Sequence, residues 1–261
     1  MDNLTLKLVL TPALIGTATL VGRRWGQSVG GWLVGLPLTT GPVAFFIALD
    51  HGAAFGAAAV VGSLVGAVAE AAFSVAYGWS ATRTAWLPAL LAGSVAYAVT
   101  AAVLQPFGLG PAALFGLVVA ALAVSIRLMP AGVPGATPAA APRWDLPARM
   151  VLATAVVLAL TALAPRLGAR WSGLLATYPL FAAILTAFGH RMQGAGAALG
   201  VLRGLLFGLF SFAAFCFVLA VGLVPLGIGG AFAGAIAVAL LVQGIALWRM
   251  GAPGALDSRE P

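Results

Sequence analysis

The sequence predicts an all-α, polytopic membrane protein of about nine transmembrane helices, in which two four-helix repeats are joined by a linking transmembrane helix. Hydrophobic residues make up 62% of the 261 positions and charged residues only 7%, whereas soluble proteins carry about 25% charged residues. The mean hydropathy is +1.09. So few polar side chains cannot cover a water-soluble globule of this length, so we expect the chain to lie in a bilayer.

The second observation is an internal repeat, which appears without gaps when the chain is shifted along itself until Pro37 falls on Pro179. In this repeat register Arg24 falls on Arg166. The other identities include Gly26, Gly31, Leu33, Leu38, Phe46, Gly52, Gly62, Leu64, Gly66 and Phe73, which fall on Gly168, Gly173, Leu175, Leu180, Phe188, Gly194, Gly204, Leu206, Gly208 and Phe215. Shared Pro, Arg and Phe are harder to explain by composition than shared Ala or Leu, so we infer that one unit occurs twice.

Nine hydrophobic segments are long enough to cross a bilayer, which takes about 20 apolar residues in a helix. They cover residues 4–22, 29–49, 56–78, 85–105, 109–129, 147–165, 171–189, 199–222 and 226–248. All are expected to be helices, because an open strand would leave unpaired amides in lipid. Between the fifth and sixth segments the chain is rich in proline, which resists helix formation, so a loop is expected there.

The expected organisation has five parts. They are a first four-helix repeat over residues 1–105, a linking transmembrane helix over 106–129, a Pro-rich cytoplasmic loop over 130–146, a second four-helix repeat over 147–250 and a disordered tail over 251–261. One similarity opposes the assignment of the first four helices as counterparts of the last four. Residues 106–110 resemble residues 225–229, which would make the fifth span the partner of the ninth.

The arginines predict the orientation of these spans. With the N-terminus outside, the cytoplasmic side holds Arg23, Arg24, Arg83, Arg127, Arg143, Arg149, Arg191, Arg249 and Arg259, whereas Lys7, Arg166 and Arg170 lie outside. Because positive residues concentrate in cytoplasmic loops, we predict an inner-membrane protein with its N-terminus outside and its C-terminus in the cytoplasm. The net charge of +7 then reflects orientation, and no nucleic-acid partner is expected. Five crossings separate equivalent helices, so the repeats have inverted topology.

Two prolines mark a candidate binding site. Inverted repeats are common in secondary transporters, whose sites lie near the middle of the membrane on interrupted helices. Pro37 and Pro179 each fall near the middle of a span and should kink or break it, which frees backbone carbonyls. These carbonyls, with the hydroxyls of Thr39, Thr40, Thr177 and Tyr178, are candidates for coordinating a small solute or ion. The alternative is two ordinary proline kinks whose backbone groups are satisfied by neighbouring helices.

Glu70 is the one carboxylate placed inside a predicted span. An acid within the membrane is a functional candidate by default, because its burial without a partner is costly. It is predicted to bind a proton or cation and to couple its movement to a solute. Arg203 is the second candidate for coupling and is also the expected partner if Glu70 only forms a structural ion pair; another alternative is that Arg203 extends to the interface. The repeat counterpart of Glu70 is Phe212, so this role is not duplicated.

Other chemistry has little support. Asp50-His51 and His190-Arg191 end spans on opposite sides of the predicted membrane, so they cannot share a metal ion. The lone Cys216 can form no internal disulfide, and no cofactor-binding or metal-binding spacing occurs, so an enzyme is not expected. The motifs Gly62-x-x-x-Gly66 and Gly204-x-x-x-Gly208 have the spacing of closely packed membrane helices, which predicts that the third and eighth spans pack together.

The half-repeat also resembles the small four-helix bacterial inner-membrane proteins of the GlpM type. The residues that carry this resemblance are Pro165-Arg166-Leu167-Gly168, Gly173-Leu174-Leu175, Pro179-Leu180-Phe181 and His190. It covers about 50 residues of the second half and implies membership of a membrane-protein lineage, without catalytic residues. The doubling in this chain departs from that family.

The predicted function is a permease or exporter of a small solute, with alternating access between the inverted repeats. Two alternatives remain open: a membrane scaffold or accessory protein, and a lipid-handling protein, which should have a laterally open groove lined by arginine. The expected partners are the lipid bilayer and a small-molecule or ion substrate, and self-association into a homo-oligomer is left open. No residue pattern identifies the substrate.

Overall fold

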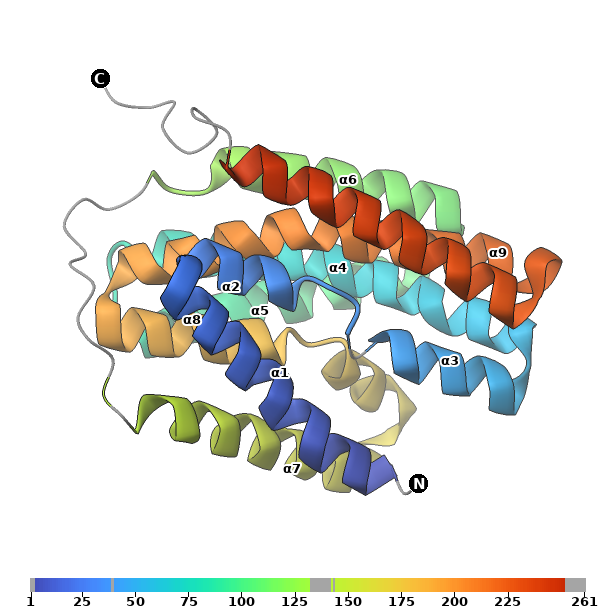
Figure 1. The fold of residues 1–261 in the computed structure, drawn as a ribbon, viewed down its shortest axis with the longest axis horizontal. Coiled ribbons are helices and arrows are strands. Elements are labelled where there is room, and N and C mark those ends of the chain that lie inside the picture. The colour runs from blue at the N-terminus through green and yellow to red at the C-terminus, as the bar shows by residue number, and fades with distance from the viewer. Residues whose placement is uncertain (1–2, 39, 132–141, 143, 252–261) are drawn as a thin grey trace.

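The computed structural model describes residues 3–38, 40–131, 142 and 144–251, without the side chains of residues 3–8, 160–161, 163–176 and 251 (Figure 1). This described part is all-helical and contains no strand. Its helices are α1 (Asn3–Trp25), α2 (Gln27–Val34), α3 (Thr40–His51), α4 (Ala53–Ala81), α5 (Trp86–Leu104), the short 3-10 helix η1 (Gln105–Phe107), α6 (Pro111–Leu128), α7 (Asp145–Ala176), α8 (Leu180–Gln193) and α9 (Ala195–Gly251).

Among the described residues, four helices are long and apolar enough to cross a membrane: α4, α5 with η1, α6 and α9. This agrees with a membrane-embedded protein. The 57 residues of α9 would extend about 85 Å as one straight helix, far more than a bilayer core of about 30 Å. Its backbone leaves helical geometry at Gly227, with φ 68° and ψ 170°, and the chain reverses there (Figure 1). Thus α9 consists of two antiparallel arms, 195–226 and 228–251.

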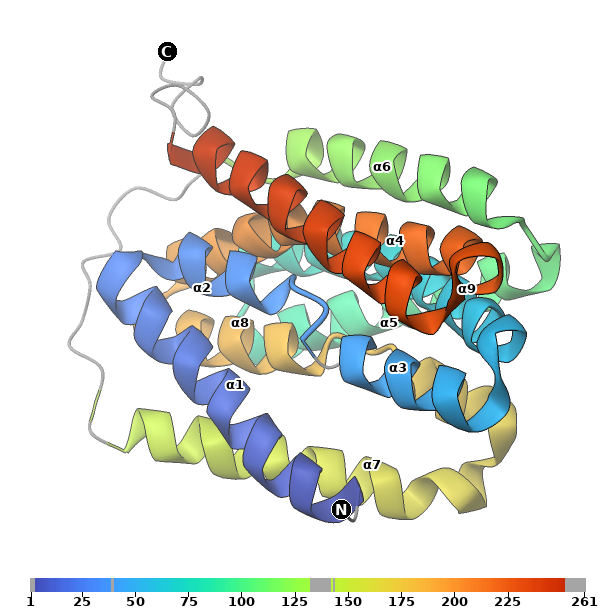
Figure 2. The same ribbon diagram turned by 45° about the vertical axis from the view of Figure 1, so that its right-hand side comes forward.

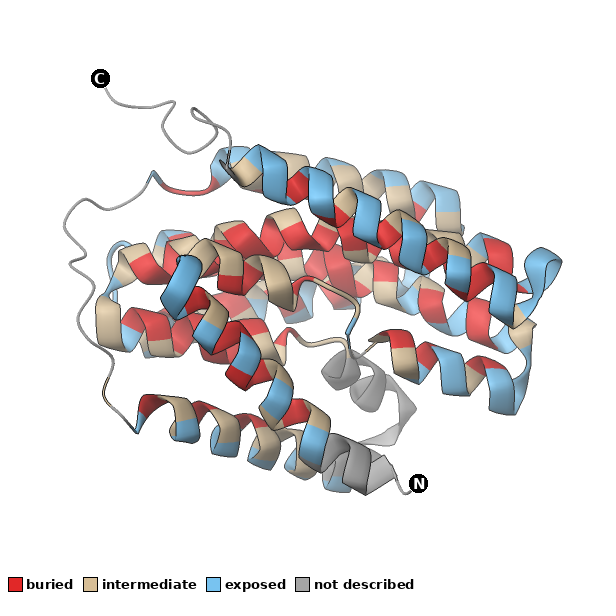
Figure 3. Cartoon of the chain, in the orientation of Figure 1, coloured by how far each residue is buried: buried red, intermediate tan, exposed pale blue. Residues whose placement is uncertain are grey.

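The centre of the bundle is formed by α4 and the first arm of α9, which carry more buried residues than the other helices (Figure 3). They pack against each other, α5 and α6 pack on α4, and α2 packs on α9. The helices α1 and α7 pack together on one side of the bundle (Figure 2). Leu64, Phe73 and Leu206 are fully buried in this core. In lipid such packing is held together by van der Waals contact, because apolar surface gains nothing by leaving hydrocarbon.

One end of the bundle gathers turns that are far apart in the sequence. There the side chain of Gln27 donates to that of Gln193 at 3.1 Å, and the indole of Trp79 donates to the carbonyl of Leu128 at 2.8 Å. Arg23 at the end of α1 reaches Asp145 at the start of α7. The start of α1, the α3–α4 turn and the reversal at Gly227 lie at the opposite end (Figure 1).

Two helices are broken at proline, as the sequence predicts. The chain is non-helical between the end of α2 and the start of α3, around Pro37, and between α7 and α8, at Pro179. The backbone bonds are the same at both breaks. Pro37 O accepts from the amide of Gly41 at 2.8 Å, and Pro179 O accepts from that of Ala183 at 2.8 Å. Acceptors and donors are both counterparts in the repeat register.

The turns that follow the broken helices also match. Gly52 precedes α4 and Gly194 precedes α9, and both have a φ of 88°, a conformation that residues with a Cβ rarely adopt. These two glycines are again counterparts in the repeat register. A glycine is therefore required at both turns for the same backbone reason.

The predicted packing of the third span on the eighth is present, but the glycine motifs that suggested it contact other segments. The helices α4 and α9 do pack together, but Gly204 and Gly208 face α2: a Cβ at Gly204 would collide with the carbonyl oxygen of Ser28, and one at Gly208 would lie 2.9 Å from the Cα of Gly35. On α4, a Cβ at Gly66 would lie 2.9 Å from the Cβ of Thr177. The central helices therefore use these glycines to approach the broken helices, since a broken segment can come closest where no side chain intervenes.

Some boundaries also differ from expectation. The second half begins slightly earlier than predicted, because α7 starts at Asp145, inside the segment assigned to the loop. The helix expected over 109–129 is α6, and η1 precedes it. Most of the predicted loop and tail, residues 132–141, 143 and 252–261, lies outside the described residues.

The close approach of α2 to α9 generates the first prediction. Gly204→Ala should lower the free energy of unfolding by about 1–3 kcal/mol, because the added methyl group meets a backbone carbonyl that cannot move independently. Gly62→Ala is the matched control, since Gly62 occupies the equivalent repeat position, is exposed and has no atom near its Cβ direction. Thermal unfolding of both variants in detergent measures the difference. Equal stability of the two would contradict the packing described.

Candidate functional site

The break between α7 and α8 is held by hydroxyl groups of α5. The phenol of Tyr97 and the hydroxyl of Thr177 lie 2.6 Å apart, and the hydroxyl of Ser94 and the phenol of Tyr178 lie 2.8 Å apart. The rings of Tyr97 and Tyr178 meet edge-on with centroids 5.4 Å apart. Two residues of the predicted site, Thr177 and Tyr178, thus lie in one polar cluster.

The sequence of α5 positions these groups. Its buried residues Ala89, Gly93, Tyr97 and Ala101 recur every four positions and form the stripe that faces the bundle. Small side chains on either side of Tyr97 let α5 approach α4, and a Cβ at Gly93 would lie 2.9 Å from the ring of Phe73. Ser94 lies three residues before Tyr97, so both hydroxyls reach the same break.

Glu70 lies on the inward face of α4. One turn away on either side, Gly66, Ala67, Phe73 and Ser74 are all buried, yet Glu70 is partly exposed. Glu70 thus lies on the face of α4 that packs against the bundle. Among the described residues, no side chain forms an ion pair or a hydrogen bond with its carboxylate.

The surroundings of Glu70 connect it to the break. Gly66, one turn earlier on α4, contacts Thr177. Glu70 therefore lies one helical turn from a residue that contacts the second break, and a carboxylate near neutral hydroxyls can bind a cation, a proton or a polar solute.

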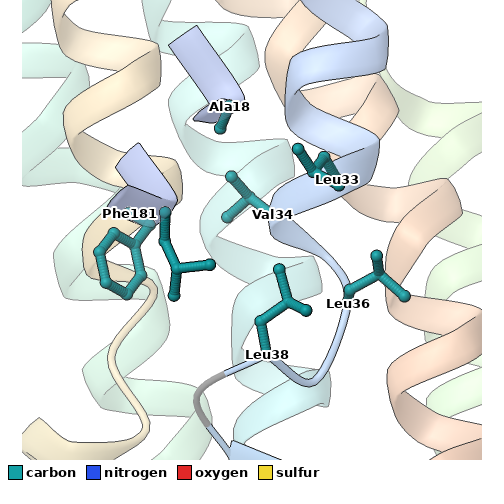
Figure 4. A pocket seen from close by; sticks show the side chains of 7 residues that line it. Ala18, Leu33, Val34, Leu36, Leu38 and Phe181 are labelled. Atoms are coloured by element: carbon teal, nitrogen blue, oxygen red, sulfur yellow. The ribbon is translucent and has the colours of Figure 1, made fainter. Parts of the chain in front are cut away.

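The break at Pro37 is different. Its surroundings are apolar, and Leu36 occupies the repeat position of Tyr178. Figure 4 shows Leu36, Leu38 and Phe181 around a small cavity of about 30 Å³ beside this break. Thr40 begins α3 and is partly buried, whereas Thr39 lies outside the described residues. The structure thus brings the two breaks near each other (Figures 1 and 2), but polar contacts gather at the second one.

Arg203 does not pair with Glu70 in the described structure. Its guanidinium donates to the carbonyl oxygen of Pro130 at 2.6 Å, and this contact holds the end of the α6 segment against α9. The expected structural ion pair is therefore wrong. The sequence could not predict this contact, because the acceptor is a backbone carbonyl.

A row of aromatic rings connects the break with the arginine-rich end. The ring of Phe73 lies 6.1 Å from that of Tyr178 and 5.8 Å from that of Tyr77. The Tyr77 phenol lies 3.3 Å from Nδ1 of His190. His190 is thus a buried, hydrogen-bonded residue and not the exposed helix-end residue that its position suggests. By contrast, Asp50 and His51 are exposed, as expected for a turn.

A charge cluster joins the two halves of the chain at the same end. Asp145 is fully buried and binds Arg23 at 2.7 Å and Arg149 at 3.0 Å. The guanidinium of Arg149 also lies over the ring of Phe188, 5.1 Å from its centroid. The sequence places Asp145 in the predicted loop, and Arg23 and Arg149 among the arginines that predict the orientation. The spacing Asp145-x-x-x-Arg149 at a helix start indicates an ion pair within one turn. No sequence pattern indicates that Arg23 on α1 joins this pair.

A larger cavity of about 460 Å³ lies between α5, α7 and α8. Its described lining residues are apolar except for Tyr178, which also belongs to the polar cluster, and Arg191. In the repeat register, the small-cavity residues Leu14, Leu36 and Leu38 fall on the large-cavity residues Val156, Tyr178 and Leu180. The cavities are thus counterparts of unequal size.

Neither a metal site nor a known relative explains these features. The described residues contain no group of three or more His, Cys, Asp or Glu side chains that could hold a metal ion. Comparisons of the chain with protein-family models, curated proteins and solved structures find no match. Any assignment of function must therefore rest on the site itself.

Asp145 generates the second prediction. Asp145→Asn should lower the free energy of unfolding by about 3–5 kcal/mol, because it leaves the buried guanidinium of Arg149 without its counter-charge. Asp50→Asn, at an exposed turn, removes the same charge and should change stability little. Denaturation in detergent compares the two variants. A loss of similar size in both would show that the cluster is not a structural contact.

Proposed function

We propose that the protein is an integral inner-membrane permease or exporter of a small solute, with alternating access between two inverted repeats. The observation that carries this proposal is Glu70, an inward-facing and partly exposed carboxylate without an ion-pair partner among the described residues, beside a broken helix. An acid without an ion-pair partner inside the membrane is energetically costly, and in membrane proteins such groups mark ion and substrate pathways. A purely structural carboxylate would be sealed in a pair.

The repeated backbone geometry supports the inverted repeats. Both breaks have the same proline, the same carbonyl-to-amide bonds and the same following glycine turn, at matching positions of the repeat register. The turns Gly52 and Gly194 lie at opposite ends of the bundle (Figure 1), as an inverted pair requires. The alternative pairing keeps some support, because Gly108 and Gly227 both have positive φ, at 55° and 68°.

Charge placement supports the orientation with the N-terminus outside. Five helices end at the same end of the bundle, where α7 and α9 begin, and each has an arginine in its last turn or just after it. These arginines are Arg23, Arg83, Arg127, Arg191 and Arg249. The positive-inside rule assigns this end to the cytoplasm. Nine crossings result if each broken helix, α2 with α3 and the end of α7 with α8, counts as one.

A transport cycle can be built from these residues. The solute binds at the middle of the bundle to the hydroxyls of Ser94, Tyr97, Thr177 and Tyr178. Protonation of Glu70 removes its charge, which lowers the cost of closing the apolar helices around it. The non-helical segments at Pro37 and Pro179 supply the hinges, because their backbones are not held by helix bonds. Coupling follows if the solute and the proton each favour the same closed state.

Hydration of Glu70 separates this proposal from a scaffold role. In native membranes, a water-soluble carbodiimide with a glycine ester should modify Glu70, detectable by peptide mass spectrometry, and should leave Asp145 unmodified. Glu70→Gln should keep the thermal stability of the protein and abolish proton flux that a panel of amino acids, amines and carboxylic acids drives in proteoliposomes. Modification of exposed Asp50 without Glu70 would indicate a dry interior, and proton flux retained by Glu70→Gln would contradict the coupling role.

A further inference from the structure

The larger cavity has a feature that solute transport does not require: among its described lining residues, the one charged group lies at one end. Apolar residues of α5, α7 and α8, among them Leu90, Leu152 and Ala187, form its walls, and Arg191 lies at the arginine-rich end of the bundle. Its volume of about 460 Å³ lies within the range of roughly 300–1,000 Å³ typical of ligand pockets. The lip is open, because Leu152 is 42% exposed. The shape and lining suit a hydrocarbon chain.

Two differences between repeat counterparts explain why this cavity is much larger than its counterpart beside Pro37. Ala187 and Leu90 line it, and their counterparts in the repeat register are Phe45 and Phe232. Those two rings meet edge-on with centroids 5.1 Å apart. Where the two phenylalanines fill the space between α3 and α9, the smaller Leu90 and Ala187 leave a groove between α5 and α8.

The head of the groove is equipped for an anion. Arg191 is exposed, and its guanidinium lies 5.9 Å from the centroid of the Trp86 ring. Trp144, which is 54% exposed, lines the same groove. Tryptophan favours the membrane–water interface, and arginine binds phosphate through paired N–H groups.

The charge of Arg191 is available to a ligand. Among the described residues that line the groove there is no carboxylate, and the nearby Asp145 is already bound to Arg23 and Arg149. The repeat counterparts of this head are apolar, since Leu49 and Ile228 occupy the positions equivalent to Arg191 and Trp86. The open groove and the cationic head thus occur together.

We propose that this groove binds an anionic phospholipid, with its phosphate at Arg191 between the two tryptophans and one acyl chain along α8 toward Tyr178. An anion at the interface joined to a chain that extends toward the membrane centre is the geometry of a lipid in its own leaflet. This site stands whether or not the protein carries a solute. It would place a lipid tail against Tyr178, whose phenol is bonded to Ser94.

Native mass spectrometry of the full-length protein in detergent tests the proposal. Phosphatidylglycerol and phosphatidylcholine with identical acyl chains are the probes. The wild type should hold one phosphatidylglycerol roughly tenfold more tightly than phosphatidylcholine, the size of one charge-assisted contact. Arg191→Gln should lose this preference. Arg83→Gln is the matched control, because Arg83 is exposed at the same end, lies 5.6 Å over the ring of Trp79 and does not line the groove.

The groove itself is tested by filling it. The double variant Leu90→Phe/Ala187→Phe copies the Phe45–Phe232 pair and should lose the bound lipid. If the double variant does not fold, Leu152→Trp obstructs the open lip instead. Val151→Trp, at a 68% exposed neighbour that does not line the groove, should retain binding. Equal affinity of the wild type for both lipids, equal losses in Arg191→Gln and Arg83→Gln, or full binding by Leu152→Trp would overturn the proposal.

Discussion

A broken helix inside a membrane exposes backbone amides and carbonyls that lipid cannot satisfy, so other protein groups must surround it. The arrangement of this bundle follows from covering two such breaks. At the first, α9 presents Gly208 to Gly35 and packs backbone against backbone. At the second, α5 supplies the hydroxyls of Ser94 and Tyr97 to the chain around Thr177 and Tyr178. The central position of α4 and α9 reflects the same need, since each carries the glycine that lets a break approach.

The two solutions have different chemical consequences. Backbone packing seals the first break in apolar surroundings, where only a cavity of about 30 Å³ remains. Hydroxyl groups at the second break create a polar region, and the carboxylate of Glu70 lies beside it. The two breaks therefore differ: the first is a packing site, whereas the second has the polar groups, with the open groove beside it.

Much of the fold follows from the sequence for physical reasons. Hydropathy predicts the helical segments because lipid excludes unpaired backbone, and Pro37 and Pro179 predict the breaks because proline cannot continue the helix bonds. The site is only partly predictable. Thr177 and Tyr178 follow from their place beside Pro179, but Ser94 and Tyr97 belong to a different helix, and nothing in the order of the chain indicates that α5 covers this break. The same limit applies to Arg203, whose acceptor is the carbonyl of Pro130, and to the groove, which exists because Leu90 and Ala187 are smaller than their repeat counterparts.

The central claim is that the two halves have opposite orientations around the breaks, and paired cysteines test it most directly. In a Cys216→Ala background, His51→Cys and Gln193→Cys form one pair of repeat counterparts, and Thr84→Cys and Leu226→Cys form another. An impermeant maleimide applied to intact cells should label His51→Cys and Leu226→Cys, and should reach Gln193→Cys and Thr84→Cys only after the membrane is permeabilised. Labelling of both members of either pair from the same side would contradict inverted repeats and remove the basis for a shared site at the centre of the membrane.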